Sequence, residues 1–176
     1  MAEIIDTQNN SEPRLSAPAP LSVEHQLSDF DCGDPVLNDW LCSRALKNES
    51  RFSRTYVVCV GKQVVAYFCI SAGAVERSAV PGKVRRNAPD TIPVSVIGRL
   101  AVDRKYSGKG LGADILSDAL RRIAIASQSI GIGAVLVHAK SDAAKSFYLN
   151  CAEFIEYPAE SRTLFLPIET VVAAFS

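Results

Sequence analysis

The chain has 176 residues, 48% of them hydrophobic, and its formal net charge is zero. This length suits one well-packed domain and is short for two, and no apolar run reaches the roughly 18 residues that a membrane-spanning helix needs. The opening residues MAEIIDTQNN lack the basic and then apolar pattern of a secretory signal. The sequence therefore predicts a soluble, cytoplasmic protein with no membrane partner.

Charge is distributed unevenly along the chain. Residues 1–34 carry seven acids and one arginine, whereas residues 44–109 carry thirteen lysines and arginines against four acids. Such a basic field attracts polyanions, which makes RNA a candidate partner. The alternative is a solvated surface with its charges scattered over several faces.

Five cysteines are present, an odd number with no C-x-x-C pair. This pattern argues against a disulfide framework and against a zinc site, so no bound metal is expected. We expect most of the five to be buried free thiols. They are Cys32, Cys42, Cys59, Cys69 and Cys151.

The first part of the chain predicts a tail followed by helices. Residues 1–21 contain three prolines and little apolar periodicity, which indicates a disordered or extended tail before a single domain over residues 22–176. Residues 25–30 are short and ambiguous and are interpreted as a first strand. Asp34 and Pro35 suit the N-cap and first position of a helix to about residue 43, and a second helical segment continues to about residue 49.

A β-hairpin is predicted next. Two runs of β-branched and aromatic residues, 55–60 and 64–71, flank a short turn and look buried on both faces at their centres. Residues 76–90 read as a polar loop, and residues 92–102 as the following strand. Strict alternation along that strand predicts one face with Val94, Val96, Gly98, Leu100 and Val102, and an opposite face with Ser95, Ile97, Arg99 and Ala101. An arginine inside so apolar a strand is expected to be either paired or functional.

Three alternately spaced glycines, Gly108, Gly110 and Gly112, connect this strand to a long amphipathic helix that should end before residue 131. Without side chains there, the backbone can close on a ligand, and the unpaired amides at the helix start favour an anion such as diphosphate. The alternative is a glycine turn that only packs a helix on a sheet. The spacing fits neither a Walker loop nor a dinucleotide fingerprint.

The remaining segments complete a mixed sheet. Residues 134–139 predict a strand parallel to the one before the glycines, because a helix connects the two. Residues 141 and 142 can cap a helix to about residue 150, the runs 154–157 and 163–166 look like closing strands, and a short helix follows residue 170. His138 is interpreted as a satisfied core or edge histidine rather than a catalytic base.

The glycine segment SGKGLG (107–112) resembles the pyrophosphate loop of the GNAT family of acetyl-CoA-dependent N-acetyltransferases, although Ser107 stands where that family usually has Gln or Arg. Together with RLAVD (99–103), HAKSDAAKSFY (138–148) and FDCG (30–33), it is similar to the TacT-type toxins, GNAT enzymes of bacterial type II toxin–antitoxin pairs. This resemblance covers about residues 22–168. It implies an α/β (α+β) GNAT fold, in which helices flank a mixed, mostly antiparallel, twisted sheet whose parallel strands splay around an acetyl-CoA site.

The resemblance also implies a function and partners. The expected reaction is acetylation of the α-amino group of aminoacyl-tRNA, which blocks translation. The expected partners are a second copy in a homodimer and a ribbon-helix-helix antitoxin, through which alone the chain would reach DNA. The residues expected to hold acetyl-CoA are Leu100, Ala101, Val102, Ser107, Gly108, Lys109, Gly110, Leu111, Gly112 and Ala113.

The chemistry of acetyl transfer suggests roles for individual residues. Backbone amides near the end of the 92–102 strand could polarise the thioester carbonyl. Tyr148, a phenol with an unperturbed pKa of about 10, suits a proton donor to the leaving thiolate; the alternative is a core aromatic beside Phe147. No good general base is evident, which favours an α-amino substrate with a pKa of about 8 over a lysine with a pKa of about 10.4.

If the amine is presented on tRNA, the basic residues are expected to contact its phosphates. The candidates are Arg44, Lys47, Arg51, Arg77, Lys83, Arg85, Arg86 and Arg99. Two other classes stay open: a general GNAT enzyme acting on a protein or small-molecule amine, and a non-catalytic module that binds acetyl-CoA.

Overall fold

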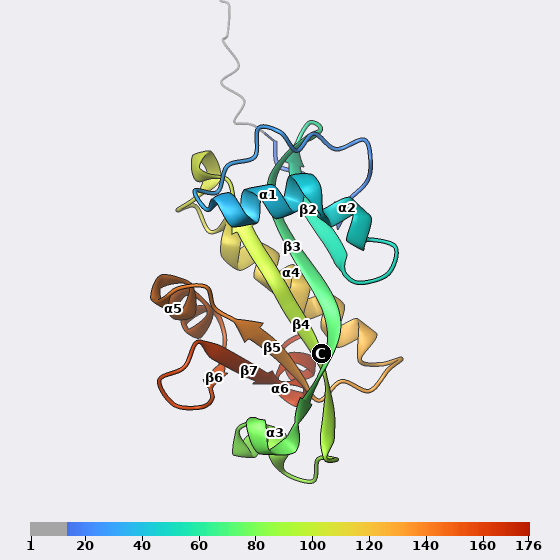
Figure 1. The fold of residues 1–176 in the computed structure, drawn as a ribbon, viewed down its shortest axis with the longest axis vertical. Helices are drawn as coiled ribbons and strands as arrows, with labels where there is room; N and C mark the ends of the chain where they lie inside the picture. Colours follow the sequence, from blue (N-terminus) through green and yellow to red (C-terminus); the bar gives the residue numbers. More distant parts are fainter. Residues whose placement is uncertain (1–13) are drawn as a thin grey trace, which may run out of the picture.

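The computed structural model describes residues 14–176 of the chain. Within this range a seven-stranded sheet has the order β1-β2-β3-β4-β5-β7-β6 (Figure 1). The strands are β1 (Ala19–Pro20), β2 (Arg54–Val60), β3 (Gln63–Glu76), β4 (Thr91–Val102), β5 (Ala134–His138), β6 (Ile155–Glu156) and β7 (Thr163–Pro167). Neighbouring strands are antiparallel except for β4 and β5, which are parallel. The predicted α/β fold with a mixed, mostly antiparallel sheet is confirmed.

Helices cover both faces of the sheet. They are α1 (Pro35–Ser43), α2 (Ala45–Asn48), α3 (Gly82–Arg85), α4 (Leu111–Ala126), α5 (Asp142–Cys151) and α6 (Ile168–Ala174), with 3₁₀ turns at Arg77–Ala79 and Arg104–Tyr106. As predicted, Asp34 caps α1, because its side chain accepts a hydrogen bond from the Val36 amide at 2.9 Å. None of the helices in the described part of the chain is long and apolar enough to cross a membrane.

The core is divided by the sheet. On one face α4, Tyr148 of α5 and Val171 of α6 bury residues such as Phe68 and Ile97. On the other face α1 places Trp40 over Tyr67 and Ala101, and the segment around α3 packs Val80 and Val84 against β4, β5 and β7. In Figure 1 α1 crosses the upper part of this second face, α3 lies at its lower end, and no helix crosses between them. In the middle of β4, Gly98 is exposed and Val96 is half-buried.

The N-terminal region differs from the prediction. Residues 14–21 are extended, and Ala19 and Pro20 pair with the edge strand β2; the remainder of the expected tail, residues 1–13, lies outside the described residues. The strand predicted for residues 25–30 is wrong, because these residues form turns with a single bridge from Gln26 to Gln63. The physical reason is local: hydrogen bonds from the His25 amide to the Ser22 carbonyl and from the Phe30 amide to the Leu27 carbonyl close turns in this stretch.

Strict alternation along β4 is also wrong, because the strand contains a β-bulge. Arg99 pairs with Cys69 of β3, whereas Ile97 pairs with the next residue, Ile70, so Gly98 is an extra residue. The bulge reverses the alternation. As a result Leu100 packs with Ile97 on the α4 face, and Arg99 lies on the α1 face.

Two smaller expectations also need correction. The segment 76–90 is more than a polar loop, since it forms a 3₁₀ turn and α3 and buries Val80 completely. Most cysteines are not buried: Cys59 and Cys69 are, while Cys32 is half-buried and Cys42 and Cys151 are exposed. The number and spacing of the cysteines could not predict their exposure, because Cys42 and Cys151 lie on the outer sides of α1 and α5.

Candidate functional site

The glycine turn between β4 and α4 has the geometry of an anion-binding loop. Gly108 and Gly110 have positive φ angles of 76° and 85°, a conformation that favours glycine. A Cβ atom added at either position would meet nothing within 4 Å. The turn therefore faces open space and does not serve only to pack the helix on the sheet.

Within the part of the chain that the structure describes, the backbone amides at this turn have no hydrogen-bond partners. The first bond of α4 runs from the Asp114 amide to the Gly110 carbonyl at 3.1 Å, and among the described residues no backbone bond is donated by residues 107–113. The Ser107 hydroxyl donates to the Arg104 carbonyl at 3.0 Å, so this side chain supports the loop. Free amides at the start of a 16-residue helix, together with the helix dipole, form a site for a negatively charged group.

A cleft of about 400 Å³ lies beside this turn. Eight of the ten residues predicted to hold the cofactor line it, together with one residue that the sequence reasoning missed, Phe147 of α5. The lining residues are Leu100, Ala101, Val102, Ser107, Gly108, Gly110, Gly112, Ala113 and Phe147. The other two predicted residues do not line it: Leu111 is buried in the α4 core, and Lys109 is exposed beside the loop. Phe147 could have been found from its place next to Tyr148.

The two parallel strands separate next to this cleft. Their pairing begins at Val94 with Ala134 and stops at Val96 with Leu136. Both strands continue further, β4 to Val102 and β5 to His138. The backbone of β4 beyond the Gly98 bulge thus has no strand partner on the β5 side, as the predicted splay requires.

Tyr148 has a buried ring and a hydroxyl without a hydrogen-bond partner among the described residues. Its ring makes edge-to-face contacts with Phe147 and Phe154, at centroid distances of 5.2 and 5.7 Å, and the residue is only 7% exposed. Among the described residues its hydroxyl forms no hydrogen bond within the protein. Burial, and secondarily the nearby Cys69 and Cys151 thiols, raises the pKa of the phenol above its ordinary value, which keeps it protonated at neutral pH.

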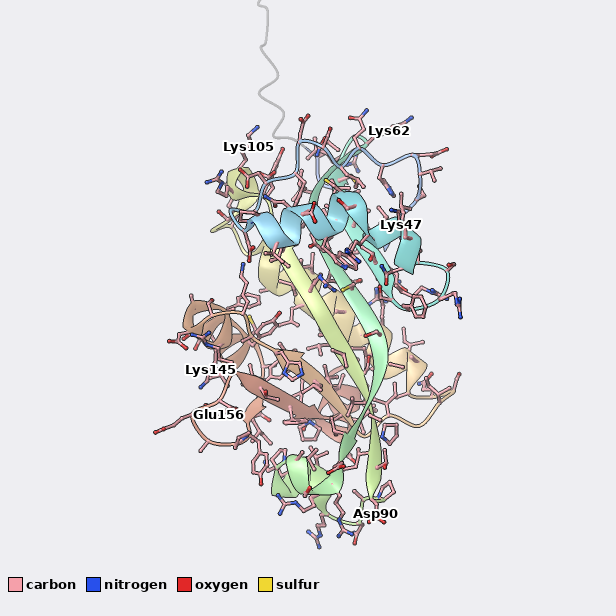
Figure 2. All side chains as sticks on the ribbon, in the orientation of Figure 1. Lys47, Lys62, Asp90, Lys105, Lys145 and Glu156 are labelled. Atoms are coloured by element: carbon pink, nitrogen blue, oxygen red, sulfur yellow. The ribbon has the colours of Figure 1, made fainter. Side chains whose placement is uncertain are left out.

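The predicted tRNA contacts fall into two groups at the two ends of the α1-bearing face, with Arg99 on β4 between them. Arg44, Lys47 and Arg51 lie around α2, and Arg77, Lys83, Arg85 and Arg86 lie around α3. Lys47 and Asp90, which follows the second group, mark these ends in Figure 2.

The Arg85 side chain is already hydrogen-bonded to other residues of the protein. It donates to the Val80 carbonyl at 2.6 Å and to the Tyr157 hydroxyl at 3.1 Å. Arg51 lies over the exposed Phe52 ring at 5.0 Å.

Acidic and metal-binding groups are not gathered at this site. Asp103 is buried, but its carboxylate accepts bonds from the Asp31 and Lys105 amides and supports the loop. His138 is exposed at the end of β5, with Nδ1 3.2 Å from the Thr163 hydroxyl, as expected for an edge histidine. Across residues 14–176 no cluster of three or more His, Cys, Asp or Glu side chains could hold a metal ion.

A parallel strand pair that splays beside a glycine turn at a helix start defines the GNAT fold. No family model matches the chain. It is 44% identical over 136 residues to the tRNA-acetylating toxin of Mycobacterium tuberculosis, an alignment that covers 77% of this chain and 82% of that protein. The chain therefore belongs to the family of TacT-type tRNA-acetylating toxins.

Solved structures agree with this assignment. AtaT complexed with acetyl-methionyl-tRNAfMet is 28% identical to the chain, with a TM-score of 0.84 over 93% of this chain and all of that one. A tyrosine-to-phenylalanine mutant of the AtaT toxin, bound to the C-terminus of the antitoxin AtaR and acetyl-CoA, is 28% identical, with a TM-score of 0.79 over 92% of this chain and 98% of that one.

Proposed function

We propose that this chain transfers the acetyl group of acetyl-CoA to the α-amino group of aminoacyl-tRNA and thereby blocks translation. The observation that supports the proposal is the cleft at the splayed strands. It has free amides at the glycine turn and Phe147 in its wall, and the protonated Tyr148 packs directly against Phe147, with 5.2 Å between the ring centroids. The family membership and the AtaT complex with acetylated tRNA support the same substrate.

The amides of residues 108–113 would bind the pyrophosphate of acetyl-CoA. They are unpaired, and Gly108 and Gly110 leave space for phosphate oxygens to approach the backbone. Because the Ser107 hydroxyl bonds within the loop, phosphate recognition would depend on the backbone, with the exposed Lys109 adding positive charge.

The amides of Leu100 and Val102 would orient and polarise the thioester. The Asp103 amide donates to the Val65 carbonyl of β3 at 2.8 Å. Since amide directions alternate along a strand, the amides of Val102 and Leu100 point toward the β5 side, where pairing has ended. A donor at this position stabilises the negative charge that develops on the carbonyl oxygen.

Tyr148 would protonate the sulfur of coenzyme A as it leaves. The raised pKa of the phenol makes it a proton donor rather than a base at neutral pH. Ser95 is buried on the α4 face, so it offers no base on the accessible side of β4. An α-amino group suits such a site, because its pKa of about 8 leaves a useful neutral fraction near neutral pH.

The two basic groups would contact the phosphates of the tRNA on either side of the cleft. Arg44, Lys47, Arg77, Lys83 and Arg86 form no ion pair among the described residues, so their charges remain available. Arg51 would join them, and Arg85 would mainly hold α3 in place.

Membership of the family supports the proposed partners. We propose a homodimer in the cytoplasm, neutralised by a ribbon-helix-helix antitoxin that provides the only link to DNA; the complex of AtaT with the C-terminus of its antitoxin supports this. The continuous sheet supports a single domain from residue 22 to the end, with the preceding residues as an extension along β2.

Transfer of radiolabelled acetyl from acetyl-CoA to charged and deacylated tRNA tests the proposal. We expect label on charged tRNA alone. Label on both, or on neither, would exclude aminoacyl-tRNA as the substrate, and labelling of free peptides or small amines instead would favour a general acetyltransferase.

A further inference from the structure

Arg99 is a half-buried cation without a carboxylate partner. Its guanidinium carbon lies 4.2 Å from the centroid of the Trp40 ring, which is 6% exposed. None of the ion pairs among the described residues involves Arg99. A stacked arginine of this kind is held in place with its full charge, so its field acts on whatever binds beside it.

The surroundings of Arg99 do not cancel this charge. On β3, the pKa values of the Tyr67 phenol and the Cys69 thiol are raised, mainly by burial, so both are neutral near pH 7. At the N-cap of α1, Asp34 is paired with Lys140, with 3.1 Å between Oδ2 and Nζ. Asp39 of α1 accepts a hydrogen bond from the Ser43 hydroxyl, and the Asp103 carboxylate, directly after β4, accepts bonds from the Asp31 and Lys105 amides. Cys32 from the preceding loop packs against the same cluster, and His138 lies at the end of β5.

Arg99 also lies beside the expected reaction centre. It is the residue before Leu100, which lines the cleft, and the Gly98 bulge directs it to the face opposite α4. This is the face that no helix covers between α1 and α3 (Figure 1). An acceptor amine that reaches the thioester from this side would pass close to the guanidinium.

We propose, on the basis of the function inferred above, that Arg99 keeps the bound α-amino group of the acceptor in its neutral, nucleophilic form. A positive charge disfavours a second positive charge nearby, so the α-ammonium group loses its proton to solvent more readily at this site. This effect would take the place of a general base, since no Asp, Glu or His is among the described residues that line the cleft. At an effective dielectric constant of about 20 and several ångströms, after screening, it corresponds to about one pH unit.

The remaining proton transfers balance without a further group. The neutral amine forms the new nitrogen–carbon bond as the carbon–sulfur bond breaks, and Tyr148 donates its proton to the departing sulfur. The proton that then leaves the nitrogen restores the phenol. One proton moves from nitrogen to sulfur overall, and Arg99 acts only as a positioning residue through its charge.

The test is the pH dependence of a single turnover, measured with the protein saturated with acetyl-CoA and in excess over charged tRNA, because this rate reports the bound state. The midpoint is the pH at which the single-turnover rate reaches half of its maximum. For Arg99→Gln we expect this midpoint to rise by about one pH unit, with roughly tenfold slower transfer below the midpoint and a near-normal rate above it. Arg99→Lys keeps the positive charge, so its midpoint should stay close to that of the unmodified protein. An unchanged midpoint in Arg99→Gln overturns the inference, as would a uniform loss of rate or a higher tRNA requirement at every pH, which indicates a phosphate contact.

Matched controls separate charge from structure. Arg122→Gln removes a guanidinium that lies 4.0 Å from the Tyr56 ring on the opposite face, and it should leave the midpoint unchanged. His138→Asn should also leave the midpoint unchanged. A changed midpoint in this variant would overturn the inference.

The unmodified protein gives a reading that does not depend on any variant folding. Its midpoint should lie below that of free aminoacyl-tRNA acetylated chemically, and an equal or higher value overturns the inference. If the unmodified protein labels no charged tRNA at any pH, the proposed function fails as well. If the protein labels charged tRNA but its midpoint equals that of free aminoacyl-tRNA, only the role proposed for Arg99 fails.

Discussion

Asp34 and Lys140 form an ion pair that joins the start of α1 to the end of β5, with 3.1 Å between Oδ2 and Nζ. Asp34 also caps α1 through the Val36 amide. The pair thus links the helix that carries Trp40 to one of the two strands that splay around the cleft. Because the pair is partly exposed to solvent, we expect its contribution to stability to be small.

Replacing Asp34 should destabilise the protein more than replacing its partner. Asp34→Ala removes both the helix cap and the ion pair, and we expect a loss of about 1 kcal/mol in the free energy of unfolding. Lys140→Ala removes only a largely exposed ion pair and should lose less than about 0.5 kcal/mol. Urea unfolding measures both, and equal losses would contradict the importance of the cap.

Asp31 should stabilise the protein only above strongly acidic pH. The Gly33 amide first, and then Arg104 and Asn38, lower the pKa of its carboxylate to about 2. A depressed folded-state pKa gives stability that is present above the unfolded value of about 3.9 and is lost as the pH falls toward 2. The difference in unfolding free energy between the protein and Asp31→Asn should therefore shrink over this window. A difference that stays constant over this window would contradict the role of these hydrogen bonds.

Tyr148→Phe should remove catalysis and leave the fold intact. The hydroxyl has no hydrogen-bond partner among the described residues, while the ring packs on Phe147 and Phe154. We expect the transfer rate to fall by about 10²–10⁴-fold and the melting temperature and acetyl-CoA affinity to change little. Tyr56→Phe, on the sheet away from the cleft, is the matched control and should keep the normal rate. A normal transfer rate in Tyr148→Phe would show that Tyr148 is a core aromatic residue without a role in catalysis.

Gly110→Ala should weaken acetyl-CoA binding through the backbone. Gly110 has a φ angle of 85°, where a side chain is strained by about 1–2 kcal/mol, although the added Cβ would meet no other atom. Gly131→Ala places a methyl group in similarly open space without a positive φ angle. Calorimetry with acetyl-CoA should show weaker binding for the first variant alone, and equal affinities would mean that the turn does not bind the phosphates.

Local signals in the sequence predicted most of the fold and most of the residues that line the cleft beside the glycine turn. The helix starting after Gly110 and the parallel relation of β4 and β5 follow from periodicity and from the helix that connects the strands. The cap at Asp34 likewise depends only on neighbouring residues. Properties of this kind are encoded within a few turns of chain, so they can be predicted without knowing the tertiary contacts.

The features that the sequence could not predict depend on contacts between distant segments. The bulge at Gly98 is a mismatch in register with β3, and it alone sends Arg99 to the side of Trp40. The pairing of Ala19 with Val57, which makes residues 19–20 the edge strand of the sheet, is a second contact of this kind. Alternation and propensity within one segment contain no information about such pairings.

The chemical identity of the labelled product tests the central claim most directly. Charged tRNA is labelled with radioactive acetyl by the protein, the ester bond is hydrolysed with mild alkali, and the released material is separated by chromatography. The account predicts that the label is released as an N-acetyl amino acid. Label that stays on the RNA after hydrolysis, or that is found on lysine side chains of protein, would contradict it.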